Sequence, residues 1–130
     1  MKKLFLLLAG MLILASCSTS SSEPYCYTST GAASLAVTGP ETGQVNQQLV
    51  YNVSFKIFNS CGAFDSFAES AGFPKNVVAK VTYEGCSCKT EETTLVKPYT
   101  FTATAAGTYV LKFATNDINA PITKTINITP

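Results

Sequence analysis

The thiol groups are the side chains of this sequence with the most chemistry open to them. The chain has five cysteines and no histidine. In an oxidising compartment an even number of thiols pairs into disulfides, whereas thiolates kept reduced bind zinc or copper(I). The Cys-x-Cys pair of Cys86 and Cys88, with Cys26 and Cys61 elsewhere, suits either chemistry. The choice depends on where the protein is delivered, and therefore on the N-terminal residues and the fifth cysteine, Cys17.

The N-terminal residues have the pattern of an export signal. Lys2 and Lys3 precede an unbroken stretch of apolar or small residues at positions 4–14. As a helix this stretch would be roughly 16 Å long, well short of a hydrocarbon core of about 30 Å. It is too short to span a bilayer, and a basic start followed by a short apolar centre predicts a secretory signal peptide.

The end of the apolar stretch determines the role of Cys17. The motif Leu14-Ala15-Ser16-Cys17 resembles the lipobox of bacterial lipoproteins. The resemblance implies cleavage after residues 1–16, a diacylglyceryl group on the sulfur of Cys17, and acylation of the new amino group by a fatty acid such as palmitate. Two or more acyl chains suffice for stable membrane anchoring without a transmembrane helix. The alternative is an ordinary signal peptide that leaves Cys17 as a free thiol.

The same resemblance bears on location and domain layout. Lipoproteins held at the inner membrane tend to carry aspartate after the cysteine, so Ser18 favours the outer membrane, on either of its faces. Residues 17–24 would form the lipidated cysteine and a flexible Ser/Thr tether with a reach of roughly 15 Å. Residues 25–130 are enough for one domain with one core and not for two.

The composition of the exported part narrows the function classes. Seven of the lysines lie beyond the leader, there is no arginine, and there are eight acidic residues. A nearly neutral domain without a basic cluster lacks the electrostatic footprint of a nucleic-acid-binding protein. Without arginine it also lacks the usual bidentate grip on phosphate or carboxylate ligands, which argues against a phosphate-dependent enzyme.

The rest of the chain has the alternating pattern of half-buried strands. The clearest case is residues 49–57, where every second side chain from Leu49 to Ile57 is apolar. Turn-forming residues separate further alternating segments at 33–37, 77–83, 99–104, 108–114 and 122–128. About seven short strands without a long helix predict an all-β fold, specifically an antiparallel β-sandwich.

One segment resembles a known β-sandwich corner. The stretch YTFTATAAGTYVLKF, residues 99–113, is similar to the strand E to strand F corner of immunoglobulin-like and fibronectin-type domains. The resemblance implies that the Tyr109 hydroxyl bonds back to the preceding loop and that Gly107 permits the turn. There is no tryptophan, so the core tryptophan of antibody domains is absent. The fold expected is an immunoglobulin-like sandwich of uncharacterised function.

Residues 63–71 depart from the alternation. Phe64, Phe67, Ala68 and Ala71 have the spacing of one helical face, and Pro74 follows soon after. The pattern predicts a short helix, Ala63–Ala71, that caps the sandwich and inserts its two phenylalanines into the open end of the core.

With Cys17 committed to lipid, the remaining four cysteines permit three disulfide connectivities. A bridge between Cys86 and Cys88 would be strained, so each is expected to reach a different partner. We favour Cys61 with Cys86, which would fasten the predicted helix over the sheet, and Cys26 with Cys88, which would tie down the start of the domain. Each bridge would add about 2–4 kcal/mol of stability. The alternative is a metal-binding or redox site built on the thiols of Cys61, Cys86 and Cys88, which an oxidising compartment disfavours.

No catalytic constellation is evident. Without histidine, Ser-His-Asp and Cys-His activation are excluded, and no cofactor or metal is expected. Asp65, Glu69 and Glu84 are the carboxylates on which an enzyme would have to rely. The sequence instead predicts a membrane-anchored, non-catalytic binding or structural module that contacts a protein or a glycan. Its candidate contact loops are residues 73–76 and 116–119.

Overall fold

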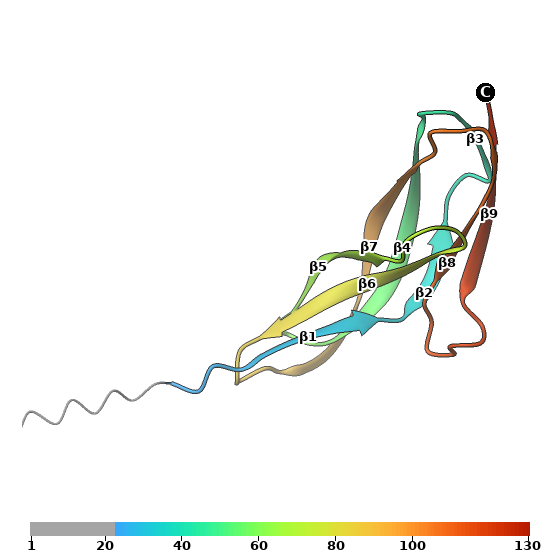
Figure 1. Ribbon diagram of the computed structural model, residues 1–130. Coiled ribbons are helices and arrows are strands. Elements are labelled where there is room, and N and C mark those ends of the chain that lie inside the picture. Colours follow the sequence, from blue (N-terminus) through green and yellow to red (C-terminus); the bar gives the residue numbers. More distant parts are fainter. Residues whose placement is uncertain (1–22) are drawn as a thin grey trace, which may run out of the picture.

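The computed structural model describes residues 23–130, and this part of the chain is folded entirely from β-strands, with no helix in it. The predicted signal peptide, Cys17 and most of the tether lie outside the described residues. Nine strands form two sheets (Figure 1). They are β1 (Tyr27–Ala32), β2 (Ser34–Thr38), β3 (Thr42–Gln44), β4 (Gln48–Asn59), β5 (Gly62–Glu69), β6 (Lys75–Glu84), β7 (Thr90–Thr102), β8 (Gly107–Phe113) and β9 (Ile122–Thr129).

The smaller sheet is antiparallel, in the order β2-β4-β7. Its central strand, β4, pairs with β7 from Gln48 opposite Thr102 to Asn59 opposite Thr90. The predicted alternation of β4 is confirmed, since its buried side chains are Leu49, Tyr51, Val53, Phe55 and Ile57. A period of two places all five on the face toward the other sheet.

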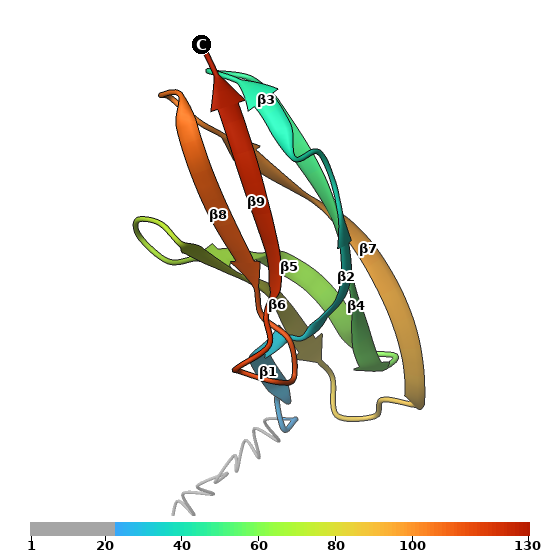
Figure 2. The same cartoon turned by 90° about the vertical axis from the view of Figure 1, so that its right-hand side faces the viewer.

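The larger sheet contains the other six strands. Strand β6 pairs with β5 along one edge and shares its other edge between β1, opposite residues 79–84, and β8, opposite residues 75–77. Strand β9 continues the sheet beyond β8, and the short β3 joins it in parallel. The turned view in Figure 2 shows β8 and β9 side by side, with β3 beside β9.

One hydrophobic core lies between the two sheets, an arrangement compatible with a β-sandwich. The largest fully buried side chains come from both sheets: Tyr51, Phe55 and Val53 from β4, Leu111 and Phe113 from β8, Ile126 from β9, and Val77 and Val81 from β6. Aromatic rings are frequent among them, with Tyr99 and Phe113 meeting edge to face at 5.6 Å. Within residues 23–130 there is no helix long and apolar enough to cross a bilayer.

The hydrogen bond predicted for Tyr109 is present. Its hydroxyl donates to the carbonyl of Ala105, four residues upstream, at 2.8 Å. Gly107 adopts φ 147° between them, a conformation that favours glycine because it has no Cβ. A second tyrosine acts similarly at this end, where the hydroxyl of the buried Tyr51 donates to the carbonyl of Pro40 at 2.6 Å.

The predicted helix at Ala63–Ala71 is wrong: most of this segment is strand β5. The reason is a β-bulge, because Phe64 pairs with Val81 and Ser66 with Lys80, which leaves Asp65 as an extra residue. In a regular strand two residues three apart point to opposite faces, but the extra residue brings Phe64 and Phe67 to the same face. Their rings lie 5.0 Å apart against the core, so a bulge produced the spacing that a helix would show.

Candidate functional site

The four cysteines of the domain form two disulfides at one end of the sandwich. The expectation of disulfides is confirmed, but the favoured pairing is wrong: Cys26 bonds to Cys86, with Cα atoms 5.1 Å apart, and Cys61 bonds to Cys88, with Cα atoms 5.5 Å apart. Neither bridge joins the two members of the Cys-x-Cys pair, as expected. A disulfide sulfur is not a thiolate, so metal binding by these residues would require reduction of both bridges.

The strand register explains the observed pairing. Because β1 lies antiparallel to β6, the residue before β1 meets the residues after β6, and the Gly85 amide donates to the Cys26 carbonyl at 2.9 Å. The turn after β4 lies beside the start of β7, where the Ser60 amide donates to the Lys89 carbonyl at 3.0 Å. Cys86 therefore faces β1, and Cys88 faces the β4–β5 turn.

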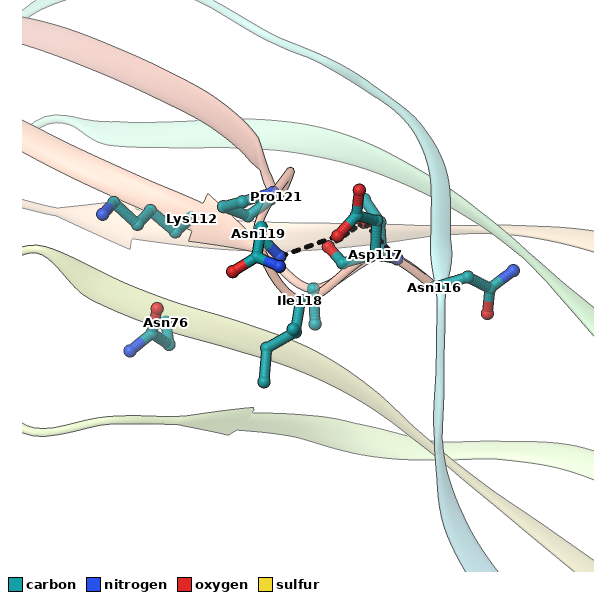
Figure 3. Close-up of a pocket in the computed structure, with 9 residues that line it drawn as sticks. Asn76, Lys112, Asn116, Asp117, Ile118, Asn119 and Pro121 are labelled. Carbon is teal, nitrogen blue, oxygen red and sulfur yellow. Dashed lines mark hydrogen bonds between the residues drawn. The ribbon is translucent and has the colours of Figure 1, made fainter.

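A cavity of about 640 Å³ lies at the β8–β9 loop (Figure 3). Its lining is mostly amide and small apolar side chains, with one lysine and one aspartate: Asn76, Lys112, Ala114, Thr115, Asn116, Asp117, Ile118, Asn119 and Pro121. Asn76, from the candidate loop at 73–76, thus lines the same cavity as the candidate loop at 116–119. Phe73 and Lys75 belong to a different surface.

The β8–β9 loop is held by its own hydrogen bonds. The Asn119 amide donates to Asp117 Oδ1 at 2.9 Å, and the Thr115 hydroxyl contacts both the Asp117 and Ala120 carbonyls. One carboxylate oxygen of Asp117 is therefore engaged in fixing the turn, as the sequence indicated for this segment. The loop presents Ile118 to solvent, with 91% of its surface exposed. A loop of this kind can bind to the surface of another molecule. It holds no nucleophilic side chain next to a general base.

A second polar cavity, of about 380 Å³, lies beside the β5–β6 hairpin. The Lys75 ammonium lies 3.2 Å from Glu69 Oε2 and 5.3 Å from the centre of the Phe73 ring. A hydrogen bond from Tyr99, and after it the Lys75 ammonium, outweighs burial and holds the pKa of Glu69 below its ordinary value. Burial, and then Glu69, raises the pKa of Tyr99. Both shifts favour a protonated Tyr99 beside an ionised Glu69 near neutral pH, so the pair presents a phenol and a carboxylate to this cavity.

The three carboxylates considered for catalysis do not form a site. Asp65 and Glu69 lie on one strand, four residues and therefore about 13 Å apart. Asp65 accepts a hydrogen bond from Ser66, while Glu84 accepts one from Tyr25 at 3.0 Å. Each carboxylate is engaged by a different neighbour.

Sequence reasoning missed a groove beside β1. Two cavities, of about 340 and 250 Å³, share Gly31, Ala32, Lys56 and Phe58. The groove exists because β2 pairs with β4 only as far as Phe55, which leaves the last residues of β4 facing the outer edge of β1. No local pattern could reveal it, since it depends on where one strand stops beside another. Comparison with protein-family models, curated proteins and solved structures finds no match for the chain.

Proposed function

We propose that this protein is a lipid-anchored, non-catalytic binding or structural module of the bacterial cell envelope, placed at the outer membrane. The observation that carries the proposal is the lipobox ending at Cys17, followed after a short polar tether by Cys26. The disulfide from Cys26 to Cys86 fastens the domain at the point where the tether enters it. Disulfides also fit an exported protein, because cytosolic thiols are kept reduced.

We further propose that the sandwich is immunoglobulin-like. The Tyr109 hydrogen bond to the preceding loop supports this, because such a tyrosine corner is a feature of those domains. Sheet topology carries no function by itself, so the role of the domain has to come from its surfaces. The hairpin cavity beside Phe73 is the surface we assign to a protein or glycan ligand, since an exposed ring next to a carboxylate, an ammonium and a phenol offers both stacking and hydrogen bonds.

The test is expression with the native leader in a bacterial host, followed by intact mass of the purified protein and membrane fractionation. We expect a mass equal to residues 17–130 plus a diacylglyceryl and an acyl group, minus four hydrogen atoms for the two disulfides. Cys17→Ala should abolish lipidation and release the protein from membranes.

Two matched variants of the next residue serve as controls. Ser18→Ala should leave both lipidation and location unchanged, whereas Ser18→Asp should keep lipidation and shift the protein toward the inner membrane. A wild-type protein without acyl groups would refute the proposed anchoring.

A further inference from the structure

Five exposed apolar side chains belong to the start of β1 or to segments around the groove beside it. Eight large hydrophobic residues are exposed among residues 23–130: Tyr25, Tyr27, Leu35, Val50, Phe58, Phe73, Val96 and Ile118. We refer to Tyr25, Tyr27, Leu35, Phe58 and Ile118 as the apolar strip. Ile118, at 91% exposure, and Tyr25, at 74%, are its most exposed members. Single exposed apolar side chains are ordinary, whereas a group of them on neighbouring segments is typical of an interaction surface.

The strip is connected through the groove beside β1. Leu35 and Phe58 line one cavity together with Asn116, which belongs to the loop that carries Ile118. Phe58 also lines the cavity at Thr30, Gly31 and Ala32 of β1. Upstream of these residues, the rings of Tyr25 and Tyr27 stack with centroids 6.2 Å apart. Leu35, Phe58 and Ile118 therefore adjoin the groove or the loop beside it, whereas Tyr25 and Tyr27 lie at the start of β1, the strand whose other end lines the groove.

The tether determines what this side can reach. The described chain begins, in blue, toward the lower end of Figures 1 and 2, where the β8–β9 loop also lies, and the C-terminus lies at the upper end in both views. Tyr25 is held to the domain through its hydrogen bond to Glu84 and the neighbouring Cys26–Cys86 bridge. Seven residues lie between Cys17 and Tyr25, which gives a root-mean-square reach of about 15 Å.

We propose that the apolar strip lies on the lipid bilayer, so that the domain rests sideways on the membrane to which it is anchored. The proposal rests on the lipid anchor of the proposed function. Tyrosine rings with polar tips suit the headgroup region, and Ile118 on its rigid loop enters the boundary of the acyl chains. Of the charged groups nearby, Lys56 and Glu92 form an ion pair at 3.0 Å, and the carboxylates of Glu84 and Asp117 accept hydrogen bonds from Tyr25 and from the Asn119 amide. The hairpin cavity beside Phe73 is not part of the strip and is left free for a ligand.

Because the chain has no tryptophan, a single introduced tryptophan is the only source of tryptophan fluorescence. We would introduce single tryptophans as Phe58→Trp and Ile118→Trp, and as a control Thr104→Trp in the exposed β7–β8 loop at the opposite end. The mature lipidated proteins are reconstituted in phosphatidylethanolamine–phosphatidylglycerol vesicles with or without brominated acyl chains. We expect blue-shifted emission and strong bromine quenching at positions 58 and 118, and water-like, unquenched emission at position 104. Near-ultraviolet circular dichroism checks that each variant is folded.

A second arm keeps this inference separate from lipidation. The domain from residue 18, with an N-terminal histidine tag in place of Cys17, is attached to vesicles that contain a nickel-chelating lipid; the chain itself has no histidine to compete. The same difference between positions 58 and 118 and position 104 is expected. Equal, weak quenching at all three positions in this arm would overturn the strip's contact with lipid even if the anchor is confirmed. A blue shift that needs high protein concentration and is insensitive to bromine would assign the strip to a second copy of the chain, and would equally overturn the proposal.

Discussion

The two ends of this domain are closed by different means. At the end where the described chain begins, two disulfides join the residue before β1, the β4–β5 turn and the β6–β7 loop. At the other end, where the chain terminates, there is no disulfide among the described residues, and two tyrosine hydroxyls bond to loop carbonyls instead. The Asn46 amide adds a bond to the Ala103 carbonyl at 2.8 Å, and β3 pairs with the last residues of β9.

The difference between the two ends matches the distribution of buried apolar side chains. The first residues of β7, Thr90–Thr94, are exposed, as is every residue of β1 except Ala32, so the end with the disulfides buries little apolar surface. Toward the other end Leu49, Tyr51, Tyr99 and Phe101 are all buried. Covalent bonds thus hold the part of a small domain that hydrophobic burial holds weakly, because a chain of this size cannot cover both ends with one core.

The largest expected effect comes from removing the bridges. Cys26→Ser with Cys86→Ser opens a loop with a sequence separation of 60, and Cys61→Ser with Cys88→Ser opens one of 27. The chain-entropy model gives a loss of about 4 kcal/mol for the first pair and slightly less for the second. Urea unfolding measures both losses, which are a large fraction of the stability of about 5–15 kcal/mol typical of a domain.

Hydrogen exchange on the same variants tests whether the two ends depend on different interactions. Amides of β1 should lose protection in the variant lacking the Cys26–Cys86 bridge, while amides in the middle of β8 and β9 retain it. Equal loss throughout both sheets would contradict the contrast, because it would mean that the bridges hold the whole sandwich and not one end of it.

Alkaline pH should act on the end without disulfides. Burial, and after it the charge of Glu41, raises the pKa of Tyr51 from 10.0 to about 12. The folded state therefore holds this proton more tightly than the unfolded state. The stability it contributes is complete below pH 10 and is lost as the pH rises through about 12. Thermal unfolding over this range, with Tyr51→Phe as the control, should show a smaller loss with pH in the variant. An identical pH dependence would assign the effect to other tyrosines.

Much of the fold was predictable because local sequence patterns specify it. The alternation at residues 49–57 identified the central strand, and the Gly107–Tyr109 pair identified the corner after β7. The helix expected around Phe64 was wrong because a bulge at Asp65 imitates helical spacing, and bulges are specified by pairing with a partner strand. The disulfide connectivity failed for the same reason, since the register of β1 on β6 places Cys86 next to Cys26.

The candidate sites were only partly accessible from sequence. The loops at 73–76 and 116–119 were proposed from the expected strand topology alone, and Asn76 does line one cavity with the second loop. The contact of Glu69 with Tyr99 and the groove between Phe58 and β1 join residues far apart in the chain. Such contacts depend on which strands lie side by side, and composition and spacing carry no information about that.

The smallest expected effect compares the two tyrosines that close the end without disulfides. Tyr51→Phe removes a bond of 2.6 Å from a fully buried ring that packs against Gly39, whereas Tyr109→Phe removes a bond of 2.8 Å from a half-buried one. A net hydrogen bond contributes about 0.5–1.5 kcal/mol, and the Tyr51 loss should lie nearer the upper limit because its bond is shielded from water. Urea unfolding of both variants and of the double variant measures the two losses and their coupling. Because the bonds hold separate loops, to Pro40 and to Ala105, the losses should add. A larger loss from Tyr109→Phe would show that the corner after β7, and not the buried ring of Tyr51, is what holds this end closed.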